Sequence, residues 1–328
     1  MVMHENPPIT PKLHHSNTPP PRLLIVKMSS LGDLFHALPA VHLIKQHTGA
    51  TVDWVVHAIY ADLARCFTDV DRVIAFPRRA FLANARAFLA NLRREEYDLV
   101  LDMQGLMKSA LVARAARAKK RIGPSFQREG ARFFYDEVSG PRHKNRHAVE
   151  ENLDMVRHLG LPVGDVVFPV RYPAQTLDLP HPRVGMLPCS RRADKNWPPE
   201  RFAEVGRALR EQAGASLVLL GSPADAPVCE TLARAIGGTL TNLCGRTSML
   251  ELGGIIKELD LLITVDSGPM HIAAAVGTPT VAVFGPTDPL KTGPYGPIHT
   301  VVKQGEILAN LPAAPVWQAA LSRIQKPR

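Results

Sequence analysis

Short apolar runs alternate with longer amphipathic stretches along most of the chain. The runs are rich in Val, Ile and Leu, as is typical of buried parallel strands, and the stretches between them have the length of helices. In the N-terminal part, strands are predicted at Arg22–Lys27, Thr51–Val56, Arg72–Ala75 and Asp98–Leu101. Helices are predicted to begin near Asp33 and to cover Ala80–Arg94 and Gly105–Ala118. This alternation predicts a β-α-β layer.

The pattern is interrupted near the middle of the chain and then starts again. A helix predicted at Ala148–Leu159 is followed by residues 160–182, which contain five prolines and little periodicity, as expected of an inter-domain connection. Further strands are predicted at Arg183–Leu187, Ser216–Leu220, Leu261–Val265 and Thr278–Phe284. We therefore expect an α/β protein with two doubly wound, Rossmann-like domains. Such sheets bind ligands at the carboxyl ends of their strands, here in a central cleft between the domains.

The domain boundaries follow from these interruptions. We expect a first domain over residues 21–165, a linker over residues 166–182 and a second domain over residues 183–328. Residues 1–20 are rich in Pro and His and have no apolar central stretch, so we expect a disordered tail rather than a secretory signal.

The composition is that of an ordinary globular protein, with 45% hydrophobic and 21% charged residues in 328. Its four cysteines are far apart and form no Cys-x-x-Cys pair, so we expect reduced thiols and a cytoplasmic location. No run approaches the roughly 20 apolar residues of a spanning helix, so we expect any membrane contact to be peripheral.

The net charge of +9 favours anionic partners such as nucleic acid, acidic lipid or a phosphorylated glycolipid. A solvated basic surface without a partner is the plainer explanation. Aromatic residues make up 6% of the chain and no recognition motif is present, which argues against nucleic acid.

The turn after the first predicted strand contains Ser29, Ser30 and Gly32, and Asp33 stands at the start of the next helix. The backbone amides of this turn could approach a ligand. An acidic residue such as Asp33 at a helix start is, however, common simply as a helix cap. The turn is not Gly-x-Gly-x-x-Gly, which weakens the case for a dinucleotide-dependent dehydrogenase.

A second turn of this kind follows the strand at Leu261–Val265. It reads Asp266-Ser267-Gly268-Pro269-Met270-His271, with Pro suited to the first helical turn. Free amides at a helix start suit an anionic diphosphate, while an ordinary strand-to-helix turn is the alternative. We expect His271 to contact a ligand rather than to be a core histidine.

Two further charged residues follow predicted strands. Lys195 lies in Cys189-Ser190-Arg-Arg-Ala-Asp-Lys195-Asn-Trp-Pro and could neutralise a leaving diphosphate, although a loop lysine is usually just solvated. Asp225 suits a ribose-hydroxyl acceptor or, equally often, a helix cap. Asp69-Val-Asp71 has the form of a metal-binding Asp-x-Asp but is interpreted as a turn, and no histidine spacing suits a metal, so we expect no metal site.

Taken in order, these elements resemble glycosyltransferase family 9, the ADP-heptose:lipopolysaccharide heptosyltransferases. The resemblance covers roughly residues 22–300 and rests on four blocks and a fifth segment. They are Lys27-Met-Ser-Ser-Leu-Gly-Asp33 with His36 and Pro39, Asp102-Met-Gln104-Gly-Leu-Met-Lys108-Ser109, Asp194-Lys195-Asn-Trp-Pro198, Asp266-Ser-Gly-Pro-Met-His271 and Val281-Ala-Val-Phe284-Gly-Pro-Thr287.

The resemblance implies a GT-B fold, inverting transfer without a metal, and a role for each matching residue. Asp33 matches the proposed base, Lys195 the residue that contacts the donor phosphate and sugar, and Asp266 the one that holds donor-sugar hydroxyls. Asp225 matches the position at which relatives use Glu to bind the ribose, and its side chain is shorter than that of Glu. The expected donor-binding residues are Ser190, Lys195, Asp225, Thr247, Asp266, Ser267, Gly268 and His271. The expected acceptor-binding residues are Ser30, Gly32, His36, Gln104, Lys108 and Arg121.

The block at Asp102–Ser109 is more similar to the first heptosyltransferase, which acts on Kdo-lipid A, than to the second. The family resemblance as a whole implies ADP-heptose as a co-substrate with no other cofactor. It also implies an anionic, Kdo-bearing glycolipid acceptor at the inner face of the cytoplasmic membrane, and we expect a monomer. Two alternatives stay open: a related transferase with another nucleotide sugar or acceptor, and an NAD-dependent oxidoreductase.

Overall fold

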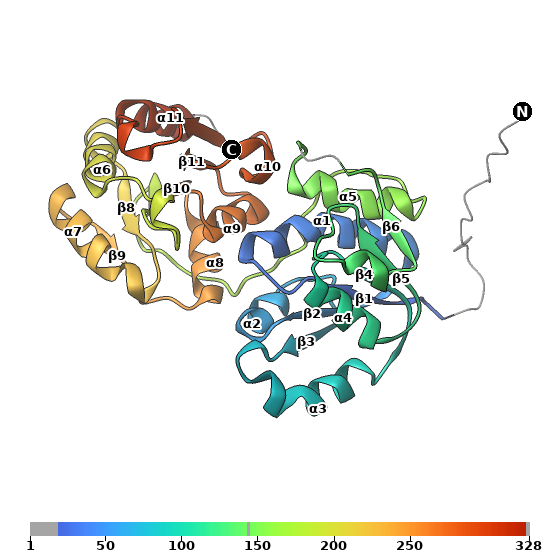
Figure 1. Ribbon diagram of the computed structural model, residues 1–328. Helices are drawn as coiled ribbons and strands as arrows, with labels where there is room; N and C mark the ends of the chain where they lie inside the picture. The colour runs from blue at the N-terminus through green and yellow to red at the C-terminus, as the bar shows by residue number, and fades with distance from the viewer. Residues whose placement is uncertain (1–18, 143–144, 326–328) are drawn as a thin grey trace, which may run out of the picture.

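The computed structural model describes residues 19–142 and 145–325. The tail expected over residues 1–20 lies outside the described residues except for its last two. Two parallel six-stranded sheets, one in each half of the chain, form the framework of the molecule (Figure 1).

The first sheet has the strand order β3-β2-β1-β4-β5-β6, the doubly wound order of dinucleotide-binding folds. Its strands are β1 (Arg22–Val26), β2 (Thr51–His57), β3 (Arg72–Phe76), β4 (Glu96–Asp102), β5 (Arg117–Pro124) and β6 (Glu137–Ser139). Alternate residues of β1 enter different cores. Leu23 and Ile25 pack with α1 (Leu31–Thr48), α2 (Ala61–Ala64) and α5 (Ala148–His158). Leu24 and Val26 pack with α3 (Phe81–Leu92) and α4 (Met107–Ala115) on the opposite face.

The second sheet has the order β12-β11-β10-β7-β8-β9. Its strands are β7 (Arg183–Leu187), β8 (Ser216–Leu219), β9 (Thr241–Asn242), β10 (Leu261–Val265), β11 (Thr280–Phe284) and β12 (Thr300–Lys303). The outer face packs against α6 (Pro199–Ala213), α7 (Ala226–Ile236) and α11 (Ala314–Ile324). The face towards the first half carries α8 (Met249–Glu258) and α9 (Gly268–Val276), and α10 (Pro289–Thr292) follows β11.

The two halves share one apolar core at their junction. Residues of α1 and α2 belong to the same buried cluster as residues of α8 and α9, among them Leu34, Ile256 and Ile272. This packing brings the start of α1 against the start of α9. Because each of these helices follows the carboxyl end of a central strand, the ligand-binding edges of both sheets face each other there.

The predicted strands match the structure within one residue at each end, with two exceptions. The strand predicted at Asp98–Leu101 begins two residues earlier, at Glu96, and the strand predicted at Thr278–Phe284 begins two residues later, at Thr280. The helix predicted at Gly105–Ala118 is wrong at its carboxyl end, because it ends at Ala115 and β5 begins at Arg117. β5 reads Arg-Ala-Lys-Lys-Arg-Ile-Gly-Pro, with only its last three residues buried, so it has no apolar run to indicate a strand. In the described part of the chain, no helix has the length and apolar character needed to cross a membrane.

Candidate active site

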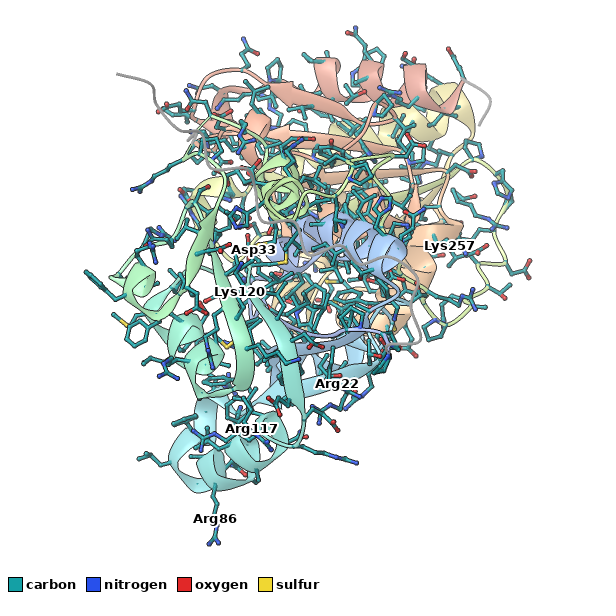
Figure 2. All side chains as sticks on the ribbon, turned by 90° about the vertical axis from the view of Figure 1, so that its right-hand side faces the viewer. Arg22, Asp33, Arg86, Arg117, Lys120 and Lys257 are labelled. Atoms are coloured by element: carbon teal, nitrogen blue, oxygen red, sulfur yellow. The ribbon has the colours of Figure 1, made fainter. Side chains whose placement is uncertain are left out.

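Asp33 lies in the first turn of α1, directly after the carboxyl end of β1 and at the junction of the halves (Figure 2). Its Oδ2 accepts hydrogen bonds from the Ser30 amide at 2.7 Å and the Ser30 hydroxyl at 2.9 Å. These contacts are those of a capping residue. The other carboxylate oxygen, Oδ1, faces Nδ1 of His36 at 3.9 Å and takes no part in the cap. Asp33 therefore caps the helix with one oxygen, and its side chain remains 40% exposed at the junction of the halves.

The turn before Asp33 is held by residues that directly follow the neighbouring strand β4. Gln104 Oε1 accepts the amides of Met28 and Ser29, both at 3.1 Å. The buried Lys27 donates from Nζ to the Met103 carbonyl at 2.6 Å. Gln104, which was expected to bind the acceptor, thus uses its side-chain oxygen to position the turn.

The surroundings of Asp33 keep it ionised. Burial by itself would raise its pKa, but the interaction with His36, the charge of Lys27 and the hydrogen bonds from Ser30 outweigh burial and hold the pKa well below its ordinary value. Burial lowers the pKa of Lys27, and the nearby Asp33 and Asp102 act in the opposite direction. A buried lysine and an ionised aspartate thus share the end of β1.

The second half contributes an ion pair at the corresponding edge of its sheet. Lys195 Nζ lies 2.6 Å from Asp266 Oδ2, although the two residues are 71 positions apart. Thr287 donates its hydroxyl to the same oxygen at 2.6 Å. The side chains of Lys195 and Asp266 are 16% and 8% exposed, so the pair is largely withdrawn from water. The structure therefore brings together Lys195, predicted to contact the donor phosphate, and Asp266, predicted to contact the donor sugar.

A histidine pair joins the two halves beside Asp33. His36 Nε2 lies 3.1 Å from His271 Nδ1, and both side chains are buried. Burial, and to a smaller extent the neighbouring His36, lowers the pKa of His271 well below its usual value. His271 is therefore neutral. The ring of His147, at the start of α5, lies edge-on to His36 with ring centroids 5.5 Å apart. Residues expected separately in the acceptor and donor sites thus touch each other.

Two of the predicted glycines allow this close approach. A Cβ atom on Gly32 would lie 2.5 Å from Cδ2 of His271, and one on Gly268 would lie 2.6 Å from a Leu31 methyl carbon. Each glycine therefore faces the opposite half. Both were expected to contact substrate, and the structure shows that they also allow the starts of α1 and α9 to pack together.

The remaining donor residues lie around the carboxyl ends of the second sheet. Ser267 precedes α9, whose first amides receive no side-chain cap, and Pro269 occupies the first turn. The Ser190 amide donates to Asn196 at 2.7 Å. Asp225 accepts the Ser222 amide and hydroxyl at 2.8 and 2.7 Å, as a cap does.

Thr247 stands two residues after Gly245, whose amide donates at 2.9 Å to the Gly221 carbonyl in the loop that carries Asp225. Thr247 lines a cavity of about 400 Å³ between α8 and the connecting segment, together with Gln175 and Leu243. Lys195, Asp225 and Asp266 do not line this cavity. The candidate site is therefore defined by the side chains that converge at the strand ends.

On the acceptor side, Lys108 is the second residue of α4, and its Nζ lies 3.3 Å from His57 Nε2. Burial, Lys108 and Arg78 together lower the pKa of His57 to about 4, so His57 is neutral and accepts this contact. Arg121, by contrast, is not brought to the cleft. Its guanidinium donates to the carbonyls of Ala113 and Ala116 at the far end of α4, where it caps the helix.

Asp69 and Asp71 bond within the first half. Asp69 lies 2.8 Å from His42, and Asp71 lies 2.6 Å from Lys45, so both carboxylates anchor α1. Among the described residues, no three His, Cys, Asp or Glu side chains are grouped to hold a metal ion. All four cysteines are free, and Cys189, Cys229 and Cys244 gather near Asp225.

Sequence patterns had assigned no role to Lys27, Thr287 or His57. Lys27 and Thr287 lie in sequence blocks that resemble the family, but the resemblance did not indicate what either side chain does. His57 ends β2 and carries no motif, so its contact with Lys108 depends entirely on the tertiary fold.

Comparison with known proteins agrees with this geometry. The family model "Glycosyltransferase family 9 (heptosyltransferase)" matches residues 85–312. Lipopolysaccharide heptosyltransferase 1 of Salmonella typhimurium is 32% identical over 90% of this chain and 98% of its own length. Lipopolysaccharide core heptosyltransferase OpsX of Haemophilus influenzae is 26% identical over 86% of this chain and 84% of its own.

Solved structures show the same two-domain arrangement. Escherichia coli heptosyltransferase WaaC with ADP superposes with a TM-score of 0.79 at 29% identity, and the match covers 92% of this chain and 99% of that one. The fold is therefore of the GT-B type, as the sequence resemblance implied. From the matched family model, the two sheets and the paired strand-end sites, we conclude that this chain belongs to glycosyltransferase family 9, the heptosyltransferases.

Proposed function

We propose that this enzyme transfers heptose from ADP-heptose to a Kdo-bearing lipid A acceptor during synthesis of the lipopolysaccharide inner core. The observation that carries the proposal is the junction of the halves. In the first half, Asp33 has one oxygen that takes no part in the helix cap. The second half contributes the Lys195–Asp266 pair, and the His36–His271 contact joins the two halves beside Asp33.

The donor fits the second half by charge and by hydrogen bonding. Lys195 and the uncapped amides at the start of α9 supply positive potential for a diphosphate. Asp266 can accept sugar hydroxyls, and Asp225 can accept those of a ribose. Structures of the similar E. coli enzyme contain ADP and ADP-2-deoxy-2-fluoro heptose, which supports an ADP-sugar here.

The reaction we propose is a single displacement. The acceptor hydroxyl oxygen forms a bond to the anomeric carbon while the bond from that carbon to the diphosphate oxygen breaks. ADP departs with the bonding electrons, and the hydroxyl proton passes to Asp33. Attack from the face opposite the diphosphate inverts the anomeric centre. Lys195 and the α9 amides stabilise the charge that develops on the leaving group, so the step needs no divalent ion.

The acceptor fits the first half. Lys108 and Arg78 lie close enough to influence the same histidine, and in the described chain neither forms an ion pair with a carboxylate. Two unpaired cations at the cleft edge suit the carboxylates and phosphates of Kdo-lipid A. We propose that the enzyme works as a monomer at the inner face of the cytoplasmic membrane, where such a glycolipid is presented.

Nucleotide selectivity tests the donor assignment. Thermal-shift measurements with ADP, UDP, GDP and NAD should show the largest stabilisation with ADP, because a ligand that binds only the folded state raises its stability. Preferential stabilisation by UDP or GDP would support a related transferase with another donor. Preferential stabilisation by NAD would contradict the transferase proposal.

A further inference from the structure

The outward face of α3 and α4 is unusual in combining exposed apolar side chains with unpaired cations. Leu82 is 93% exposed, Phe133 is 89% exposed and Leu111 is 50% exposed. Large apolar side chains left in water at a shared surface indicate a binding face. We call this surface the α3/α4 face.

The elements that carry these residues form one continuous layer. α3 and α4 cover the same side of the first sheet and share a core that contains Phe88 and Val112. Their carboxyl ends are joined by a hydrogen bond of 2.8 Å from Arg93 to the Ala115 carbonyl. Phe133 belongs to η3 (Ala131–Phe134), which packs on α4 through Ala110 and Ala131.

The charge on this face is mainly positive, with one exposed carboxylate, Glu129, which accepts the Met107 amide at the start of α4. Residues 77–94 and 103–128 contain no Asp or Glu. The cations that flank the apolar side chains are Arg79, Arg86, Arg114 and Arg128. Within the part of the chain that the structure describes, none of these four forms an ion pair. By contrast, Arg117, Lys119 and Lys120 on β5 are each paired with a carboxylate.

The face also borders the proposed acceptor site. α3 and α4 begin at the carboxyl edge of the sheet, and Lys108, in the first turn of α4, lies 3.3 Å from His57 at the end of β2. Figure 2 shows Arg86 at the end of the first half that is farthest from the second half, with Asp33 between the two halves. A flat partner on the α3/α4 face would therefore leave the second half free.

We propose that the α3/α4 face docks on an anionic phospholipid bilayer, with Leu82, Leu111 and Phe133 inserted among the acyl chains and the arginines on lipid phosphates. Apolar side chains surrounded by Lys and Arg are characteristic of interfacial anchors, and each cation adds to binding at an anionic surface. A nucleic acid would use the arginines but gain little from Leu82 or Leu111. The inference rests on the proposed function, because docking in this way delivers a lipid-borne acceptor to Asp33.

Vesicle flotation of the full chain tests the docking. Binding should be weak on phosphatidylcholine vesicles and strong when about 30% phosphatidylglycerol is included, and salt of about 0.5 M should reduce it. Leu82→Ser with Phe133→Ser should lower the vesicle partition coefficient at least about a hundredfold, the effect expected from losing two buried apolar side chains. Arg79→Gln, Arg86→Gln and Arg114→Gln should each lower it by about fivefold.

The matched control is Leu290→Ser with Ile307→Ser, two residues of the second half that are 76% and 64% exposed. This variant should float like the wild type. The proposal is overturned if the wild type ignores anionic vesicles, or if the two serine pairs behave alike. It is also overturned if Leu82→Ser with Phe133→Ser leaves vesicle binding intact while heparin abolishes it, since the face would then attract only polyanions.

Transfer to a deacylated, water-soluble acceptor separates this inference from the proposed function. Leu82→Ser with Phe133→Ser should retain that turnover and the wild-type melting temperature, because both side chains are exposed. Absence of turnover in the wild type would count against the proposed function and leave the flotation result to decide the docking.

Discussion

We assign the Lys195–Asp266 ion pair two roles, in binding the donor and in folding stability. Lys195→Met removes the cation that we assign to the leaving diphosphate, so turnover should fall about 10²–10³-fold. Asp266 would keep its hydrogen bond from Thr287 but lose that from Lys195, and the loss of a charged hydrogen bond should cost about 1–3 kcal/mol of folding stability.

Lys291→Met is the matched control, since Lys291 lies on α10 and pairs with Asp288 at a more exposed site. Steady-state kinetics with varied donor, together with melting temperatures, distinguish the two variants. Equal kinetics for both would show that Lys195 does not act on the donor.

Lys27 tunes Asp33 through its charge. The pKa of Asp33 lies well below its ordinary value, so the carboxylate stays ionised as the pH falls, and the wild-type rate should show no acidic limb from Asp33 down to about pH 5. Lys27→Met removes a positive charge that favours the ionised form. The Asp33 pKa should then rise, and an acidic limb should move to higher pH.

The measurement is the pH dependence of kcat for Lys27→Met and for Lys120→Met, a lysine of β5 paired with Glu137. A purely structural role for Lys27 predicts a lower rate at every pH with an unchanged profile. That result would contradict the electrostatic assignment.

At the scale of elements, the account depends on how closely α1 and α9 approach. Gly32→Ala would place a methyl group 2.5 Å from a carbon of His271, and overpacking of this kind costs about 1–3 kcal/mol. We expect the halves to be forced apart and transfer to fall at least about tenfold. Gly164→Ala is the control, because its added carbon meets only Leu43 at 3.9 Å. Wild-type transfer by Gly32→Ala would show that the approach is not needed for catalysis.

The strands that are buried on both faces were predictable, because burial requires apolar residues along their whole length. β1 and β10 read Arg-Leu-Leu-Ile-Val and Leu-Leu-Ile-Thr-Val, and central parallel strands must be apolar on both faces. β5 was missed because its charged side chains point outward and pair with carboxylates that only the sheet brings near. Local pattern contains no information about such partners.

The same limit applies to the site. Asp33 and His271 were identifiable because each stands at a strand-to-helix turn. The contact between His36 and His271 spans 235 positions and depends on how the halves pack, which no local motif encodes. Arg121 was expected to bind the acceptor, whereas its position on β5 directs its guanidinium to the carbonyls at the far end of α4.

For the whole molecule, the central claim is that the junction of two Rossmann-like halves positions Asp33 as the base for sugar transfer. Asp33→Asn retains much of the shape and the capping contacts to Ser30, so a structural role predicts little change. A base predicts a fall in turnover of about 10²–10⁴-fold with unchanged donor affinity. Asp62→Asn, which removes a carboxylate that is 79% exposed, is the control for charge alone.

The decisive measurement is turnover of Asp33→Asn in excess chelator, alongside its donor affinity and melting temperature. We predict that the wild type and Asp62→Asn remain active in chelator, because no step of the proposed reaction uses a divalent ion. Asp33→Asn should bind donor and melt normally but transfer sugar at least about a hundredfold more slowly. Near-normal turnover by Asp33→Asn with normal stability would contradict the account.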